Sequence, residues 1–574
     1  MRQWTLPELP PIPDAENLAS YLDISPLFLS VLWRRGLRSR EAIDNYLNAR
    51  LGNLTRPELW PLIPQAAEKL VSKIRKGAKI AVWGDYDVDG VTSTTLVLDV
   101  FEAHGIEPVP YLPDRLKEGY GLNIKGIEDL ASRGCDVLLT VDCGIGNNEA
   151  VKRARELGMS VFVSDHHLPP GNLPEATAIV DPRVAAGSPW PCEDLAGVGV
   201  AFYFMAAVNN LLSASSGRRY QMDEALDLVA LGTIADIMTL SGENRILTRG
   251  GLNKLAKSAR PGVNALKTVS GLTLGAEINS QEVGFRLAPR INAAGRMGHP
   301  GIALKLLRGK DPQEAAILAA KLDEYNTKRK LEEERIFGQA SEQAETLLER
   351  DNLSSLVLAG EDWHPGVVGI VASKIVEAFN MPAIILYETG DRLKGSGRSL
   401  PPFDLYQGLK KCESCLTGFG GHKQAAGVSL LRHNLDNFRR IFSDVVREEL
   451  GDKPPLQDLI LAGELNFAEA SDAAFLKELQ LMEPYGPGNE EPVFVSPPLQ
   501  IAEIKSLGRG GKHVRLKLRD GESDTTLDAK AWGMGAEFPR GMEKSMIRIA
   551  YTPRIDNYRG IPEIDIGIKD WKKI

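Results

Sequence analysis

The sequence predicts a multidomain α/β protein with a parallel, doubly wound domain, a long connecting helix, a second α/β domain and a C-terminal all-β barrel. Three patterns predict it: apolar runs that alternate with helical segments from residue 77, an unbroken charge-rich helical pattern over 311–350, and alternating apolar and polar residues after 453. Repeated strand–helix units are typical of parallel sheets covered on both faces, and period-two alternation is typical of antiparallel barrels. At 574 residues, the chain is too long for a single compact core.

The chain divides into five predicted segments. Prolines and the short helical patterns "SPLFLSVLWRRG" and "SREAIDNYLNAR" indicate an N-terminal helical cap. The boundaries that we expect are 1–60 for the cap, 61–310 for the doubly wound domain, 311–350 for the connecting helix, 351–452 for the second α/β domain and 453–574 for the barrel.

In the doubly wound domain we expect strands at 79–85, 135–144 and 159–167, with helices at 92–105 and 148–158 between them. The apolar stretch 197–212 is shorter than the ~20 residues that a membrane span requires, so it predicts a buried helix. The first residues lack an apolar leader, and five cysteines suit a reducing compartment, so we expect a cytoplasmic protein with no membrane partner. The pair in "CESC" has no second pair to complete a zinc site and is interpreted as two residues on a helix face.

Acidic and imidazole groups follow the predicted strands. Asp85, Asp87 and Asp89 come after the first strand, Asp142 ends the second, and "SDHH" ends the third with Asp165, His166 and His167. Parallel strands deliver their carboxyl ends to one edge of a sheet, and we take Asp236, within an apolar segment, as a fourth strand-end position.

Carboxylate and imidazole ligands without thiolates favour Mn²⁺ or Mg²⁺ over Zn²⁺. Asp142 could bridge two such ions, which together would act on a phosphoryl group. A solvated acidic loop is the alternative for "GDYDVDG" taken alone; Asp85 is the least secure ligand, and Asp165 could serve to orient the histidines.

Cationic and aromatic side chains in glycine-bearing segments are candidate substrate contacts, because arginine binds phosphate bidentately and glycine allows close approach. An ordinary surface loop, or glycines that only permit tight packing, would be the alternative. The candidates are Arg115 and Tyr120 in "PDRLKEGYG", Arg296 in "NAAGRMG", Ser396 and Arg398 in "GSGRS", and His422 in "GFGGHKQAAG".

One predicted barrel strand, "HVRLKLRD", has a basic face. Alternation sends Val514, Leu516 and Leu518 to one side and His513, Arg515, Lys517 and Arg519 to the other. Taken alone, this pattern is explained by a strand face exposed to solvent. In a chain that also contains a phosphoesterase site, a basic barrel face favours binding of single-stranded nucleic acid.

The motifs "GDYDVDGVTS", "TVDCGI" and "SDHH" resemble those of the DHH phosphoesterase superfamily, and "WHPGVVGIVASKI", "GSGRS" and "GFGGHKQAAG" resemble its bacterial single-stranded-DNA-specific exonucleases. The resemblance implies a DHH domain, a DHH-associated domain and an oligonucleotide-binding (OB) barrel, with no further domain after Ile574. It also implies 5′-to-3′ cleavage of single-stranded DNA, and two Mn²⁺ or Mg²⁺ ions. The implied ligands are Asp87, Asp89, Asp142, His166 and Asp236, with His167 near the scissile phosphate.

Two other functions stay open from the sequence. One is a phosphodiesterase for cyclic dinucleotides or short oligoribonucleotides, whose superfamily members usually lack the barrel. The other is a non-catalytic DNA-binding scaffold, whose members lose metal ligands that this chain keeps. The resemblance further implies single-stranded-DNA-binding protein and a repair helicase as partners.

Overall fold

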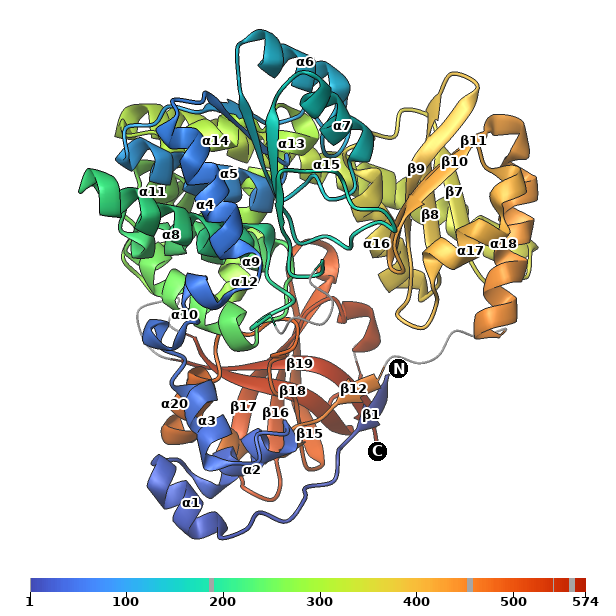
Figure 1. Cartoon of the computed structure of the whole chain (residues 1–574). Helices are drawn as coiled ribbons and strands as arrows, with labels where there is room; N and C mark the ends of the chain where they lie inside the picture. The colour runs from blue at the N-terminus through green and yellow to red at the C-terminus, as the bar shows by residue number, and fades with distance from the viewer. Residues whose placement is uncertain (1, 185–189, 452–457, 540, 557–562) are drawn as a thin grey trace. The chain divides into compact units, whose positions relative to one another are not determined.

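The computed structural model describes residues 2–184, 190–451, 458–539, 541–556 and 563–574 (Figure 1). The chain forms two compact units. Unit 1 consists of Met1–Asn53, Thr239–Arg249 and Leu456–Ile574, and unit 2 of Leu54–Met238 and Gly250–Pro455. Both α/β domains therefore belong to unit 2, whereas the barrel belongs to unit 1.

The first domain of unit 2 contains the predicted parallel sheet. Its strands lie in the order β3-β2-β4-β5-β6, and every neighbouring pair is parallel. All five residues of the two central strands β2 and β4 are buried, as expected for a sheet covered on both faces. The bounds are β2 (Ile80–Gly84), β3 (Val109–Tyr111), β4 (Val137–Val141), β5 (Ser160–Ser164) and β6 (Ala178–Val180).

Helices cover both faces of this sheet, so the doubly wound prediction is confirmed. α6 (Ile124–Ser132) and α7 (Asn148–Glu156) bury their apolar stripes in one cluster with β2, β4 and β5. α5 (Val88–Ala103) and α8 (Gly197–Ser216) pack together and against the strands, beside α4 (Ile63–Arg75) (Figure 1). α8 is apolar and long enough to cross a membrane, yet 78% of its apolar window is buried, which is typical of the core helix that the sequence predicts.

A series of helices completes unit 2 around this domain. They are α9 (Leu226–Ala235), the later part of α10 (Gly242–Ala256), α11 (Pro261–Val269), α12 (Ser280–Glu282), α13 (Ala288–Met297) and α14 (Gly301–Arg308). The long helix α15 (Pro312–Arg350) begins where Asp311 accepts hydrogen bonds from the amides of Gln313 and Glu314. It packs on α11, α13 and α14 and then on α16 (Val368–Phe379), so it connects the two α/β domains as predicted.

The second domain has a mixed sheet. The strand order is β10-β11-β9-β8-β7, in which only β7 and β8 are parallel. Cys412 and Cys415 are buried in an apolar cluster with residues of this sheet, and they lie at the end of the helix 405–411 and in the turn after it rather than along a helix face. The bounds are β7 (Leu356–Gly360), β8 (Ala383–Thr389), β9 (Arg392–Arg398), α17 (Leu405–Lys411), β10 (Gly418–Gly421), β11 (Ala425–Leu431) and α18 (Leu435–Leu450).

Unit 1 contains a closed barrel. The strands run β18-β15-β16-β17-β19, and β19 pairs back with β18. All pairs in this ring are antiparallel except β17 with β19, which is the strand arrangement of an OB fold. The bounds are α19 (Phe467–Ala470), α20 (Ala473–Leu481), β13 (Gly463–Glu464), β14 (Phe494–Val495), β15 (Leu499–Leu507), β16 (His513–Asp520), β17 (Thr526–Ala531), β18 (Met546–Asp556) and β19 (Glu563–Lys573).

The N-terminal segment is helical as predicted, but it is part of the barrel unit rather than a separate cap. α1 (Ala15–Leu22), α2 (Pro26–Arg34) and α3 (Arg40–Leu47) bury their apolar residues in the same core cluster as the barrel strands. β1 (Gln3–Thr5) pairs in parallel with β12 (Asp458–Ile460). In the inserted segment 239–249, the Arg245 guanidinium donates to the carbonyls of Tyr46, Leu481 and Met482. These contacts join residues that are far apart in the sequence, so no local sequence pattern predicts them.

Candidate active site

Two aspartates lie at the start of α5. Asp87 caps the helix, and its Oδ1 accepts a hydrogen bond from the Gly90 amide at 3.1 Å. Asp89 is 2% exposed and accepts hydrogen bonds from the amides of Gly197 (2.6 Å) and Val198 (2.9 Å) at the start of α8. The N-terminus of α8 thus points at the Asp89 carboxylate, which itself lies in the first turn of α5, and both positions favour negative charge there.

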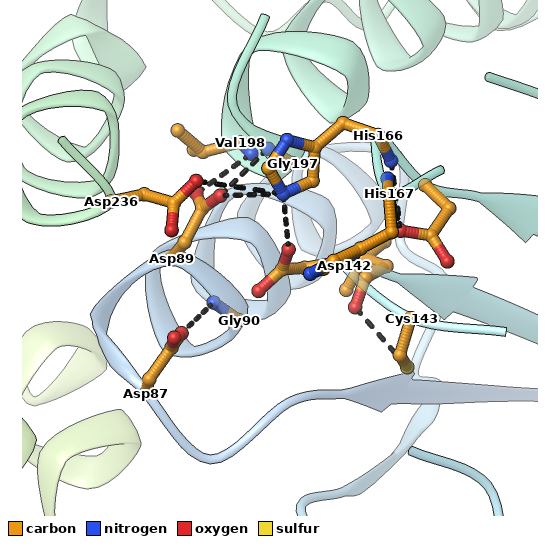
Figure 2. Close-up of polar contacts among 12 residues, drawn as sticks. Asp87, Asp89, Gly90, Asp142, Cys143, His166, His167, Gly197, Val198 and Asp236 are labelled. Carbon is orange, nitrogen blue, oxygen red and sulfur yellow. Dashed lines mark hydrogen bonds and ion pairs between the residues drawn. The ribbon is translucent and has the colours of Figure 1, made fainter. Parts of the chain in front are cut away.

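His166 lies among three carboxylates that come from different elements (Figure 2). Its Nε2 is 3.1 Å from Oδ1 of Asp142, 3.6 Å from Oδ2 of Asp236 and 3.9 Å from Oδ2 of Asp89. Asp142 follows β4 with a left-handed backbone (φ 62°), which turns the chain sharply at the edge of the sheet. The strand ends therefore deliver their polar groups to one place, as predicted.

Three overlapping groups of side chains could each hold a cation, since in each group one ligand atom per residue lies within 4.8 Å of the others. Asp142 belongs to two groups and His166 to two, so neighbouring ions would share ligands. The groups are Asp85 with Asp87 and Asp142, Asp89 with His166 and Asp236, and Asp142 with His166 and His167.

The electrostatics of the cluster fit divalent cations. Burial, followed by the repulsion of neighbouring carboxylates, raises the pKa of Asp89 and Asp142 well above the usual range. Burial and then Asp87 raise the pKa of Asp236 to about 7. Burial and then His167 lower the pKa of His166 to about 3, which keeps its imidazole neutral.

Three buried atoms of the cluster lack a hydrogen-bond partner among the described residues: Oδ1 of Asp85 and both ring nitrogens of His166. Without a cation, carboxylates this close together would retain protons instead of ionising. A divalent ion replaces those protons, and a set of carboxylates with neutral imidazole suits Mn²⁺ or Mg²⁺. The residues present therefore fit the predicted metals.

Asp165 holds both histidines in position, which is the orienting role that its place in "SDHH" suggested. It is fully buried and accepts hydrogen bonds from the amides of Ile145, His166 and His167. Its Oδ1 also lies 2.7 Å from Nδ1 of His167. Burial alone would lower the pKa of His167, but the hydrogen bond with Asp165 raises it to about 9. The Tyr120 hydroxyl lies 3.2 Å from the same Nδ1, so His167 is held from two sides.

The prediction that Asp236 follows a strand is wrong. Residues 226–235 form α9, and Asp236 is the C-cap of that helix. A short, continuous apolar run has no period that separates a buried strand from a buried helix, which explains the error. The side chain nevertheless reaches the cluster that the sequence assigned to it.

The three predicted arginines are electrostatic neighbours in unit 2. Arg296, in the last turn of α13, donates to the Gly366 carbonyl at 2.9 Å. Burial, followed by repulsion from Arg115, lowers the pKa of Arg296 to about 9, and the same two causes lower the pKa of Arg398. The Arg115 guanidinium lies 4.9 Å from the centre of the Tyr86 ring. Like charges gathered in this way indicate a binding site for an anion.

The second domain contributes Ser396 and His422 to the same region. A Cβ on Gly369, in the first turn of α16, would lie 3.3 Å from Oγ of Ser396 and 3.2 Å from Nη2 of Arg398. His422 follows β10, and burial, then Arg398 and then His167 lower its pKa. All six predicted substrate contacts therefore belong to unit 2, along with the metal cluster.

Sequence reasoning missed two residues of the site. Gly197 donates its amide to Asp89 and leaves room for Asp142, because a Cβ there would lie only 2.6 Å from Oδ1 of Asp142. Glycine at the start of the long apolar helix "GVGVAFYF" was the available signal. The second is Tyr86, between Asp85 and Asp87, whose ring faces the Arg115 guanidinium. A single aromatic residue within an acidic motif does not indicate such a contact from the sequence.

Three family domains match the chain. Residues 79–233 match the DHH family N-terminal domain, residues 352–448 match the DHHA1 domain, and residues 462–570 match the RecJ OB domain. Their order and positions agree with the first α/β domain, the second α/β domain and the barrel.

Curated relatives match nearly the whole chain. The single-stranded-DNA-specific exonuclease RecJ of Bacillus subtilis is 34% identical over 97% of this chain and 69% of its own length. The protein of the same name from Escherichia coli is 33% identical over 95% of this chain and 96% of its own length.

Solved structures agree with these relatives. RecJ from Thermus thermophilus in complex with Mn²⁺ superimposes with a TM-score of 0.84, at 30% identity over 100% of this chain and 80% of that one. The complex of RecJ from the same organism with Mg²⁺ gives a TM-score of 0.78, at 28% identity over 100% of this chain and 78% of that one.

Proposed function

Because the chain belongs to the RecJ family of single-stranded-DNA-specific exonucleases, we propose that it hydrolyses single-stranded DNA with Mn²⁺ or Mg²⁺ and acts in DNA repair and recombination. The observation that carries the proposal is the cluster of buried carboxylates around neutral His166, which fits two divalent ions. We further propose cleavage from the 5′ end with release of 5′-mononucleotides.

Asp87, Asp89, Asp142, His166 and Asp236 would hold the two ions, with Asp142 between them. When bound, a pair of divalent ions activates water and neutralises charge on the oxygens of a phosphodiester. The protein supplies the placement: backbone amides fix Asp89, and Asp142 is held by the sharp turn after β4. Asp165 keeps both histidines in position.

His167 would contact the scissile phosphate. Its raised pKa keeps a proton on the ring at neutral pH, so the imidazolium can donate a hydrogen bond to a phosphate oxygen. Its side chain is 44% exposed, in contrast to the 7% of His166, so it is accessible to a substrate.

Arg115, Arg296 and Arg398 would bind the 5′-terminal phosphates, with Ser396, His422 and Tyr120 as neutral contacts. Arg115 repels both Arg296 and Arg398, so an anion bound beside these guanidinium groups would be favoured because each phosphate contact relieves that repulsion. Recognition of a terminal phosphate beside the metals would limit cleavage to the first nucleotides of a strand.

Two alternatives carry less support. A phosphodiesterase for cyclic dinucleotides or short oligoribonucleotides would have no use for the complete OB barrel. A non-catalytic scaffold would not need the full set of carboxylates, all of which are present. We propose a cytoplasmic location, with single-stranded-DNA-binding protein and a repair helicase as partners, on the family resemblance alone.

The test is incubation with long single-stranded DNA labelled at either end, with cyclic dinucleotides, and with or without Mn²⁺. The expected result is Mn²⁺-dependent release of 5′-labelled mononucleotides, with the 3′ label retained on shortening strands. Asp142→Ala should abolish this release, and loss of the 3′ label first would contradict the polarity. Cleavage of cyclic dinucleotides but not of DNA would favour the alternative enzyme.

A further inference from the structure

Helix α9 of unit 2 ends with an isoleucine at a position that favours glycine. The amide of Ile237 donates a hydrogen bond to the carbonyl of Ile234, and the amide of Met238 donates to that of Thr233, both at 3.2 Å. These two bonds form a Schellman motif, whose left-handed residue is usually glycine. The helices α5, α6 and α7 end with the same pair of hydrogen bonds, and there the residues equivalent to Ile237 are Gly105, Gly134 and Gly158.

The backbone of Ile237 is strained. Its φ is 58°, in a region that glycine adopts freely but that β-branched residues rarely adopt. Among the residues that the structure describes, nine non-glycine residues have a positive φ, and Ile237 is the one β-branched residue of these nine. Packing does not offset the strain, because Ile237 is 72% exposed. Uncompensated strain of this kind is typical of functional sites.

Ile237 lies beside the metal cluster. It directly follows Asp236, whose Oδ2 is 3.6 Å from Nε2 of His166 (Figure 2). Consecutive Cα atoms are about 3.8 Å apart, so the side chain of Ile237 begins within one residue of a metal ligand. Leu168 has the same placement on another element, because it directly follows His167 and is 69% exposed. Asp236 and His167 each have a ligand atom within 4.8 Å of one on His166, so both apolar residues adjoin one site.

A nucleobase is the partner that suits exposed aliphatic side chains at this place. A nucleotide bound here would present its phosphate to the ions, and the aliphatic groups of Ile237 and Leu168 offer that phosphate no hydrogen bond. Such groups gain free energy when an apolar surface covers them. The faces of a base are the largest apolar surface of a nucleotide, and they are accessible in a single strand.

We propose that Ile237, together with Leu168, contacts the nucleobase next to the scissile phosphate and thereby holds the strand in register with the metal cluster. Contact with the face of a base does not involve its hydrogen-bonding edges, so it would serve any sequence. The backbone strain at Ile237 is then the cost of placing an aliphatic side chain where glycine would be more stable. The inference rests on the proposed function, because it assigns further contacts to the same substrate.

The experiment compares thermal unfolding with steady-state hydrolysis of single-stranded DNA in Mn²⁺, on the full-length protein. Ile237→Gly and Ile237→Asn both introduce residues that accept a left-handed backbone, so the midpoint of unfolding should rise by roughly 1–4 °C. Both variants lose the aliphatic contact, so KM should rise roughly 3- to 30-fold while kcat stays within about twofold. A residue that served only the fold would not gain stability and lose substrate binding together.

Three further variants serve as controls. Ile237→Val keeps a β-branched aliphatic side chain, so its KM should stay within about threefold of the wild-type value. Leu168→Ala should raise KM in the same direction as the variants of Ile237. Ile317→Ala removes an aliphatic side chain of similar exposure, 70%, from α15 of the same unit and should behave as the wild type does. Calorimetric Mn²⁺ affinity should be unchanged in Ile237→Asn, which shows that Asp236 still reaches the ions.

Oligonucleotides with a single abasic site at successive positions from the 5′ end identify the contacted base. One abasic position should raise the KM of the wild type and should not raise that of Ile237→Asn further, because both changes remove the same contact. If every abasic position affects the two proteins equally, the base contact is wrong.

The outcomes separate this inference from the proposed function. If Ile237→Gly and Ile237→Asn keep the wild-type KM while Mn²⁺-dependent hydrolysis persists, the base contact is wrong and the proposed function stands. A lower midpoint of unfolding at unchanged KM would assign Ile237 to the stability of the fold instead. Absence of hydrolysis in the wild type would contradict the proposed function and this inference with it.

Discussion

Gly197→Ala should disturb the metal centre although glycine carries no functional group. The added Cβ would lie 2.6 Å from Oδ1 and 2.7 Å from Cβ of Asp142. Ordinary contacts are about 3.5 Å, so Asp142 or the start of α8 must shift by roughly 0.9 Å. The same shift would lengthen the hydrogen bond from the Gly197 amide to Asp89.

A displacement of this size sets the expected magnitude. Loss of groups that orient metal ligands typically weakens metal binding about 10- to 100-fold, and misplacement by about 1 Å can slow turnover on the order of 100-fold. The stability of the fold should change little, because alanine is favoured over glycine in a helix by up to about 1 kcal/mol, which offsets part of the strain.

The assay is calorimetric titration with Mn²⁺ together with nucleotide release from single-stranded DNA at saturating Mn²⁺. Gly199→Ala, two positions along the same helix, is the control. Its Cβ would lie 3.2 Å from the rotatable Cδ2 of Leu195, far less crowded than 2.6 Å from a ligand oxygen. Wild-type Mn²⁺ affinity and turnover in Gly197→Ala would refute the view that Asp142 needs this glycine to reach the ions.

The same geometry supports three further predictions. Asp165→Asn removes the charge that raises the pKa of His167 to about 9. Activity should fall, and the alkaline limit of activity in a pH–rate profile should move to lower pH. An unmoved limit would exclude a role for protonated His167. In metal-free protein the pKa of Asp236 is raised to about 7, so this group contributes stability that is fully present below its unfolded pKa near 4 and is lost as pH rises through 7. The gain in Tm on adding Mn²⁺, measured by scanning calorimetry, should therefore grow from pH 6 to pH 8. A gain that shrinks with pH would contradict this. Arg296→Ala should weaken binding of 5′-phosphorylated DNA roughly 10- to 100-fold and blur its discrimination from unphosphorylated DNA in a competition assay. If single alanine variants at Arg115, Arg296 and Arg398 all keep wild-type preference, these arginines do not form a phosphate pocket.

The strand-end residues could be predicted because a parallel sheet converts sequence order into position. Once β2, β4 and β5 were recognised as neighbouring strands, Asp87, Asp142 and His166 had to end at one edge. Asp236 was placed in the right cluster on the wrong element, because the apolar segment around it was interpreted as a strand although it forms a helix. The role of Gly197 could not be predicted, because it depends on how closely α8 approaches Asp142. A local sequence pattern does not indicate the distance between two packed elements.

The barrel shows the same limit. Alternation along β16 predicted its buried and outward residues correctly: Val514, Leu516 and Leu518 are buried. It could not indicate that the N-terminal helices complete the same core, because that packing depends on residues hundreds of positions away. It also could not pair Trp532 with His513, which requires the register of β16 with β17.

The shared core of the N-terminal helices and the barrel has a consequence for synthesis. Ser25 hydrogen-bonds Glu478, 453 positions later, so α2 leaves the ribosome long before its partner exists. At 5–20 residues per second this delay is roughly 20–90 s, during which Phe28 and Leu32 lack the core that buries them. The nascent chain therefore exposes an apolar, aggregation-prone segment while unit 2 is made, and a holding chaperone should bind the first fifty residues throughout that interval.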